Sequence, residues 1–185
     1  MKRTSRSFNV LDGMVLVAAT ALGIALYRAL DHRLEEGNTL WLPVLYLPRW
    51  AWRWGLGSMP IAAAWTPALA LLRARQPRPT PRRLARQPGW VANVAASSAL
   101  VIGSLSWGFL WATAGRPEQL GDPVGLVSSI FFRTLPFVGV SVAASWRCLG
   151  LGGRWQAERS WIDRAGRALG WYWVVTFPLS LGLSL

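Results

Sequence analysis

The sequence predicts an all-α integral membrane protein, a bundle of five transmembrane helices, and three observations lead to this fold class. The chain of 185 residues is 52% hydrophobic and only 15% charged, whereas soluble domains are roughly 25% charged. Its apolar residues gather in five blocks, each close to the ~20 residues that cross the hydrocarbon layer as a helix. The basic residues collect in alternate connecting segments, which is typical of multi-pass membrane proteins.

The five blocks define a single membrane domain over residues 1–185 and span residues 10–30, 54–72, 90–114, 124–146 and 168–185. Lipid offers no hydrogen-bond partners to the backbone, so blocks of this length form helices. A four-helix arrangement, in which the first or last block does not cross, is the alternative.

The start of the first block allows a second alternative, a cleaved signal peptide, because the basic stretch MKRTSR precedes it. The length of the apolar run and Asp12 at its head favour a retained helix. Asn9 and Asp12 have the spacing of a capping box, in which two residues at a helix start exchange hydrogen bonds. Ser160 and Asp163 repeat this spacing before the last block.

Two further segments have a composition typical of the membrane surface. Residues 40–53 are rich in tryptophan but are interrupted by Pro43 and Pro48, so we expect an interfacial segment, with a re-entrant segment as the alternative. Residues 154–169 place Trp155 and Ile162 near one helical face and charges opposite. This pattern fits an amphipathic interfacial stretch or a plain basic loop.

The distribution of positive charge predicts the orientation. Five helices place residues 1–9, 73–89 and 147–167 on one side, with three, six and five basic residues, fourteen of the chain's 20. Because cytoplasmic loops carry the Lys/Arg excess, we expect a cytoplasmic N-terminus and an external C-terminus in a plasma (inner) membrane. All basic residues except Lys2 are arginine, which indicates a high-GC, bacterial genome.

The stretch RARQPRPTPRRLARQPG, residues 73–89, is predicted to be a cytoplasmic loop that contacts lipid headgroups. A basic side chain near an anionic surface gains about 1 kcal/mol. Nucleic acid is not an expected partner, because the loop has no aromatic residue on which bases could stack; protein docking is the alternative. The candidate headgroup contacts are Arg73, Arg75, Arg78, Arg82, Arg83 and Arg86.

Arg133 is a candidate intramembrane site. Asp122 and Pro123 form a helix start, which places Arg133 about ten residues into the fourth span. An arginine at mid-membrane costs roughly 2.5–3.5 kcal/mol and therefore normally faces protein or water. Ser129 lies one turn away on the same face. The pair could contact an anion or substrate; the alternative is an arginine that extends toward the outer surface.

Small residues at four-residue spacing predict close helix packing. Ala95, Ala99 and Gly103 form such a row in the third block, and Ala19 and Gly23 form one in the first. We therefore expect these two helices at the centre of the bundle.

The residue inventory argues against catalysis. Cys148 and His32 are single residues of their type, so neither a two-histidine metal site nor a cysteine pair can form within one chain. We expect no enzyme activity, no cofactor and no metal. The predicted function is that of a scaffold or accessory subunit, with anionic lipid, a membrane-protein partner or a second copy as partners. A small transporter or channel subunit that uses Arg133 is the alternative.

The stretch FNVLDGMVLVAATALGIAL, residues 8–26, resembles the start of small, uncharacterised multi-pass membrane proteins of high-GC bacteria. Those proteins begin with a few basic residues, an F-x-L-x-D-like turn and an apolar run; Val10 departs from the leucine of that pattern. The resemblance implies an integral membrane protein and no particular activity or site.

Overall fold

A computed structural model describes residues 8–36, 49–75, 80–113, 123–158 and 160–184. All regular elements in these ranges are helices, so the predicted all-α fold class is confirmed for this part of the chain. They are α1 (Val10–Glu36), α2 (Arg49–Ala74), α3 (Pro81–Leu84), α4 (Pro88–Thr113), α5 (Pro123–Leu151) and α6 (Trp161–Ser184).

The helices extend beyond the predicted blocks. Helix α2 begins at Arg49 and so includes the end of the segment 40–53, whose first nine residues lie outside the described ranges. Helix α6 begins at Trp161, so the second half of the stretch 154–169 is the first part of this helix. Trp155 lies outside it, in the link between α5 and α6. A four-residue helix, α3, forms within the predicted loop 73–89.

Three of the described helices are long and apolar enough to cross a membrane: Val10–Leu30, Pro88–Thr113 and Gly125–Leu151. These match the first, third and fourth predicted spans, while five spans are not confirmed. Helices α2 and α6 contain arginines, prolines and several aromatic residues with polar atoms, which lower their average hydropathy. The structure therefore fits a membrane protein with at least three spanning candidates.

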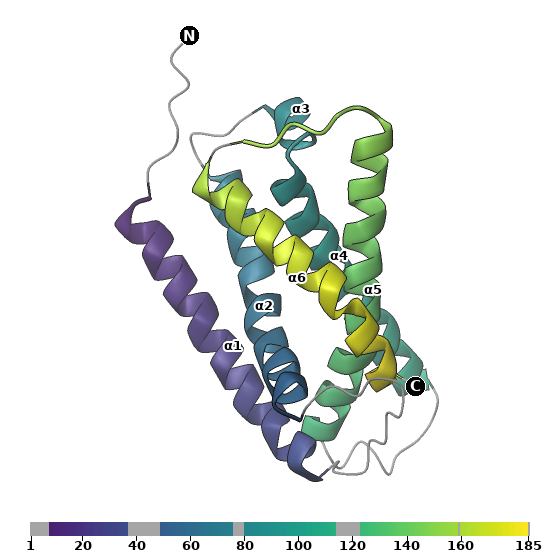
Figure 1. The fold of residues 1–185 in the computed structure, drawn as a ribbon. Coiled ribbons are helices and arrows are strands. Elements are labelled where there is room, and N and C mark those ends of the chain that lie inside the picture. Colours follow the sequence, from purple (N-terminus) through teal and green to yellow (C-terminus); the bar gives the residue numbers. More distant parts are fainter. Residues whose placement is uncertain (1–7, 37–48, 76–79, 114–122, 159, 185) are drawn as a thin grey trace.

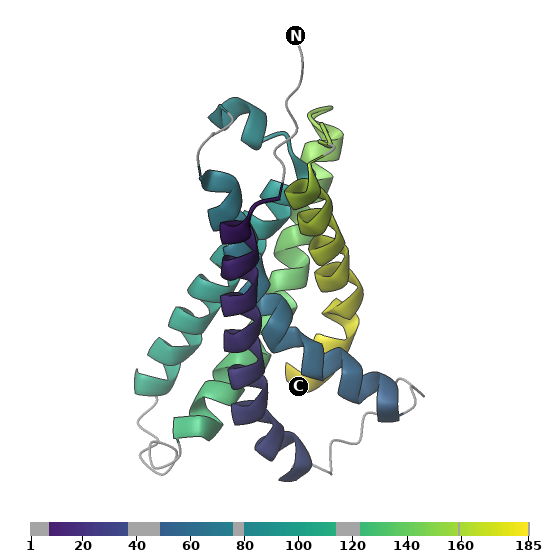
Figure 2. The same ribbon diagram turned by 90° about the vertical axis from the view of Figure 1, so that its left-hand side faces the viewer.

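Helix α2 lies inside the bundle, between α1 on one side and α4 and α6 on the other (Figure 1). Helices α4, α5 and α6 also pack against one another. Helix α1 lies at the edge and packs mainly on α2 (Figure 2). The expectation that the first span is central is therefore wrong. The small residues of α1 instead allow its contact with α2. A Cβ on Gly23, for example, would lie 2.5 Å from the Cα of Ile61 of α2.

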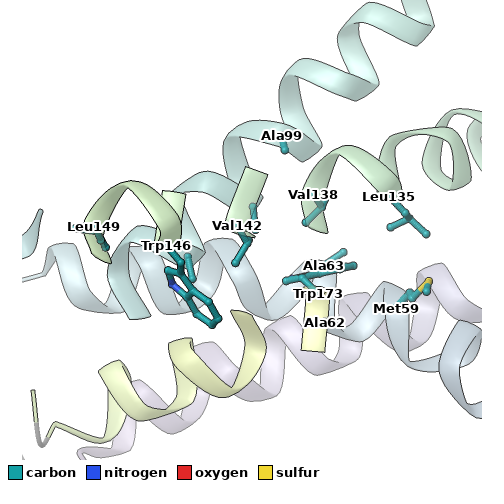
Figure 3. Close-up of a cluster of buried hydrophobic side chains, with 12 residues drawn as sticks. Met59, Ala62, Ala63, Ala99, Leu135, Val138, Val142, Trp146, Leu149 and Trp173 are labelled. Atoms are coloured by element: carbon teal, nitrogen blue, oxygen red, sulfur yellow. The ribbon is translucent and has the colours of Figure 1, made fainter. Parts of the chain in front are cut away.

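The main core joins α2, α4, α5 and α6 (Figure 3). Alanines of α2 and α4 leave room for large side chains of α5 and α6, such as Trp146 and Trp173, which are buried. The Trp173 Nε1 group donates a hydrogen bond to Thr66 Oγ1 of α2 at 3.1 Å. Inside a membrane, close packing and interhelical hydrogen bonds hold helices together, because lipid is as apolar as the core.

Candidate functional site

Three ion pairs lie at one end of the bundle. Helix α3, the link 152–158 and the first turns of α1, α4 and α6 all lie at this end (Figure 1). The three segments predicted to be cytoplasmic therefore share one end in their described parts. We call this end the basic end; it consists of residues 73–75, 80–89 and 147–167, apart from those outside the described ranges.

Asp163 joins two helices at the basic end. It lies in the first turn of α6 and is 2% exposed. Its carboxylate accepts hydrogen bonds from the backbone N–H of Gly89 and of Glu158, each at 3.0 Å. Arg167 Nε lies 3.3 Å from the same carboxylate. Because Gly89 is the second residue of α4, Asp163 of α6 satisfies an otherwise free donor at the start of α4.

Burial raises the pKa of Asp163 above its ordinary value, and the two backbone hydrogen bonds partly oppose this rise. The packing here is tight: a Cβ on Gly89 would lie 2.3 Å from the carbonyl oxygen of Asp163.

The capping box predicted from Ser160 and Asp163 is present only in half. Ser160 Oγ accepts from the Asp163 N–H at 3.3 Å, while the Asp163 carboxylate bonds to Gly89 and Glu158. At the start of α1, by contrast, the predicted pair exchanges both bonds: Asn9 Oδ1 accepts from the Asp12 N–H at 2.9 Å and Asp12 Oδ2 from the Asn9 N–H at 3.4 Å.

Glu158 holds two of the loop arginines. It forms an ion pair with Arg73 of α2, and Arg83 Nε of α3 lies 2.7 Å from its other oxygen. The Arg73 side chain is 8% exposed and that of Arg83 is 54% exposed. Arg73 Nε also donates to Gln87 Oε1 at 3.0 Å. One carboxylate therefore ties the end of α2 and the α3 turn to the link before α6.

The link between α5 and α6 is attached at further points. Gly153 has a φ of 59°, a left-handed conformation that glycine adopts without steric cost, and it turns the chain after α5. The Gln156 N–H then donates to Arg86 O at 2.9 Å. Trp146 Nε1 of α5 donates to Pro88 O, also at 2.9 Å. The link, α3 and the start of α4 therefore form one connected unit.

The predicted headgroup contacts have different surroundings. Arg73 is buried in an ion pair, Arg83 is half-exposed and paired, and Arg75, Arg82 and Arg86 are exposed. Arg78 lies outside the described residues. Sequence reasoning missed the role of Glu158 and Asp163. The sequence did contain a sign of this role, because Glu158 and Asp163 are the only acidic residues in the three segments that hold fourteen basic residues.

Arg133 has a different setting. Its side chain is exposed on the outer surface of α5, and its guanidinium carbon lies 5.0 Å from the centre of the Trp107 ring of α4. This is a cation–π contact. Ser129, the other member of the candidate intramembrane site, is partly buried.

Among the described residues, no group of three or more His, Cys, Asp or Glu side chains is placed to hold a metal ion. Cys148 is exposed near the end of α5. The chain gave no match when it was compared with models of protein families, with curated proteins and with solved structures. The resemblance of residues 8–26 to small bacterial membrane proteins therefore stays a prediction.

Proposed function

We propose that the protein is a multi-pass integral protein of a bacterial inner membrane that acts as a non-catalytic scaffold or accessory subunit. In this proposal the basic end faces the cytoplasm and lies against anionic headgroups. A partner membrane protein, or a second copy of the chain, binds the outer surface of the bundle. The N-terminus is cytoplasmic and the C-terminus is external.

The fixed structure of the basic end is the observation that carries the proposal. Two carboxylates hold Arg73, Arg83 and Arg167, while other arginines of the same end are exposed. A connected unit of this kind presents positive charge at a defined place, whereas a loose basic loop would not. Positive charge next to spanning helices favours the cytoplasmic side and attracts anionic lipid.

Purification tests the scaffold role. The tagged chain is expressed at its native level and extracted in mild detergent, and the proteins that accompany it are quantified. We expect a partner, or a second copy, in fixed stoichiometry. Recovery of a monomer free of any stoichiometric protein would overturn the scaffold proposal.

Cysteine labelling tests the orientation. Exposed Cys148 is replaced by alanine, and single cysteines are placed at Ala85 of the basic end and Thr113 at the far end of α4. We expect a membrane-impermeant reagent to label only the Thr113 position in intact cells. Labelling of the Ala85 position instead would reverse the proposed orientation.

A further inference from the structure

Three tryptophans form a cluster beside the basic end. Trp146 of α5 is buried, and its ring contacts Trp155 of the link and Trp171 of α6 edge-on, with centroids 5.8 and 5.3 Å apart. Trp155 and Trp171 are 43% and 60% exposed. The cluster thus joins the outer surfaces of three segments and turns two aromatic rings outward. Exposed tryptophans are typical of the layer between headgroups and hydrocarbon.

Three exposed arginines accompany this cluster. Arg147 follows Trp146 on α5, Arg154 precedes Trp155, and Arg164 lies two turns before Trp171 on the same face of α6. These cations are separate from the ion pairs described above, in which Glu158 holds Arg73 and Arg83 and Asp163 holds Arg167. The surface therefore offers positive charge to an anion from outside the chain.

The same helix faces continue into apolar surface. Val175 lies one turn beyond Trp171 on α6 and is 66% exposed, and Val140 lies two turns before Arg147 on α5 and is 50% exposed. Along α6 the outward side chains change from a cation to an indole to an aliphatic group. A phospholipid has a matching order of phosphate, glycerol and acyl chain.

We propose that one anionic phospholipid binds along the outer faces of α5 and α6. Its phosphate lies among Arg147, Arg154 and Arg164, its glycerol region lies against Trp155 and Trp171, and its chains follow the valines. The proposal rests on the proposed function, in which the basic end faces a membrane. Charge complementarity specifies an anionic ligand, and the apolar surface below the tryptophans specifies a lipid over free phosphate.

Two variants with the same loss of charge test this site. The lipid-site variant carries three substitutions around the tryptophan cluster: Arg147→Gln, Arg154→Gln and Arg164→Gln. The control variant removes three exposed arginines from the α2–α3 side of the same end: Arg75→Gln, Arg82→Gln and Arg86→Gln. Each purified protein is mixed in detergent with equal amounts of phosphatidylglycerol and phosphatidylcholine, and bound lipid is counted by native mass spectrometry.

We expect the wild type and the control variant to retain one phosphatidylglycerol, and the lipid-site variant to bind it on the order of 100-fold more weakly. The single substitution Arg164→Gln, at an exposed position of α6, should weaken binding about fivefold and is measured if the triple variant unfolds. Glycerol phosphate, which lacks acyl chains, should not displace the lipid. Displacement by glycerol phosphate would show a phosphate site and overturn the lipid assignment.

The outcomes separate this inference from the proposed function. If both triple variants lose phosphatidylglycerol equally, the basic end attracts anionic lipid through its total charge and the specific site is refuted. If the wild type itself shows no preference for phosphatidylglycerol over phosphatidylcholine, the proposed contact of the basic end with anionic lipid also fails.

Discussion

The two arginines that share Glu158 provide a direct test of how burial sets the strength of an ion pair. The Arg73 side chain is 8% exposed and also donates to Gln87, whereas the Arg83 side chain is 54% exposed. Arg73→Gln and Arg83→Gln remove the same charge from the same carboxylate. Their effects on stability should nevertheless differ several-fold.

The magnitudes follow from solvent screening. An exposed ion pair contributes about 0.2–1 kcal/mol to folding, so Arg83→Gln should lower the free energy of unfolding by about 0.5 kcal/mol. A shielded, charge-assisted hydrogen bond contributes about 1.5–3 kcal/mol. Arg73→Gln also disturbs the bond to Gln87, so we expect a loss of about 2–3 kcal/mol.

Thermal unfolding in mild detergent, measured at low and high salt, distinguishes the two variants. The effect of Arg83→Gln should almost vanish in 1 M salt, where screening acts within about 3 Å, while that of Arg73→Gln should persist. The double variant Arg73→Gln/Glu158→Gln should lose less stability than the sum of the two single losses, because both substitutions remove the same ion pair. Equal, salt-sensitive effects of the two arginine substitutions would refute the argument from burial.

Three further predictions concern other parts of the bundle. Burial raises the pKa of Asp163, so its charged form is disfavoured in the folded state, and protonation relieves that cost. As the pH falls from neutral through this raised pKa, the stability of the wild type relative to Asp163→Asn should therefore rise. Unfolding midpoints of both proteins over a pH series measure this difference. A difference that stays flat or falls would contradict the prediction. Gly23→Leu should weaken the α1–α2 contact by more than 2 kcal/mol, because even a Cβ there would lie 2.5 Å from the Ile61 Cα. The control Gly150→Leu, where the new side chain meets open space, should be nearly neutral in the same unfolding assay. Arg133→Leu should leave membrane accumulation unchanged and shift stability by at most about 1 kcal/mol, the size of an exposed cation–π contact; a loss of several kcal/mol would show that Arg133 is paired inside an assembly.

Patterns confined to one segment predicted this structure well. The helical class followed from block length, and the start of α1 followed from Asn9 and Asp12, which exchange the hydrogen bonds of a capping box. The helix start at Pro123 also agrees with the expected bounds. These features depend on neighbours within a few residues, which a sequence displays directly.

Contacts between distant segments were the part that the sequence did not reveal. Glu158 and Arg73 are 85 residues apart, and Asp163 and Gly89 are 74 residues apart. The six arginines of residues 73–89 looked equivalent because the sequence carries no sign of which one lies under the link. The fold makes Arg73 a buried partner, while Arg82 and Arg86 stay exposed.

The arrangement of the helices explains why hydropathy selects only some of them. The apolar windows of α1 and α4 are only 17% and 6% buried within the bundle, so these helices turn most of their apolar surface outward. Helix α2, which hydropathy does not select, contributes buried side chains such as Thr66, Leu69 and Leu72. A helix that neighbouring helices cover needs little apolar surface of its own, because its polar atoms bond across helices, as Thr66 does with Trp173. Low average hydropathy is therefore expected of α2, which neighbouring helices cover, and it does not conflict with the five spans that the sequence predicts.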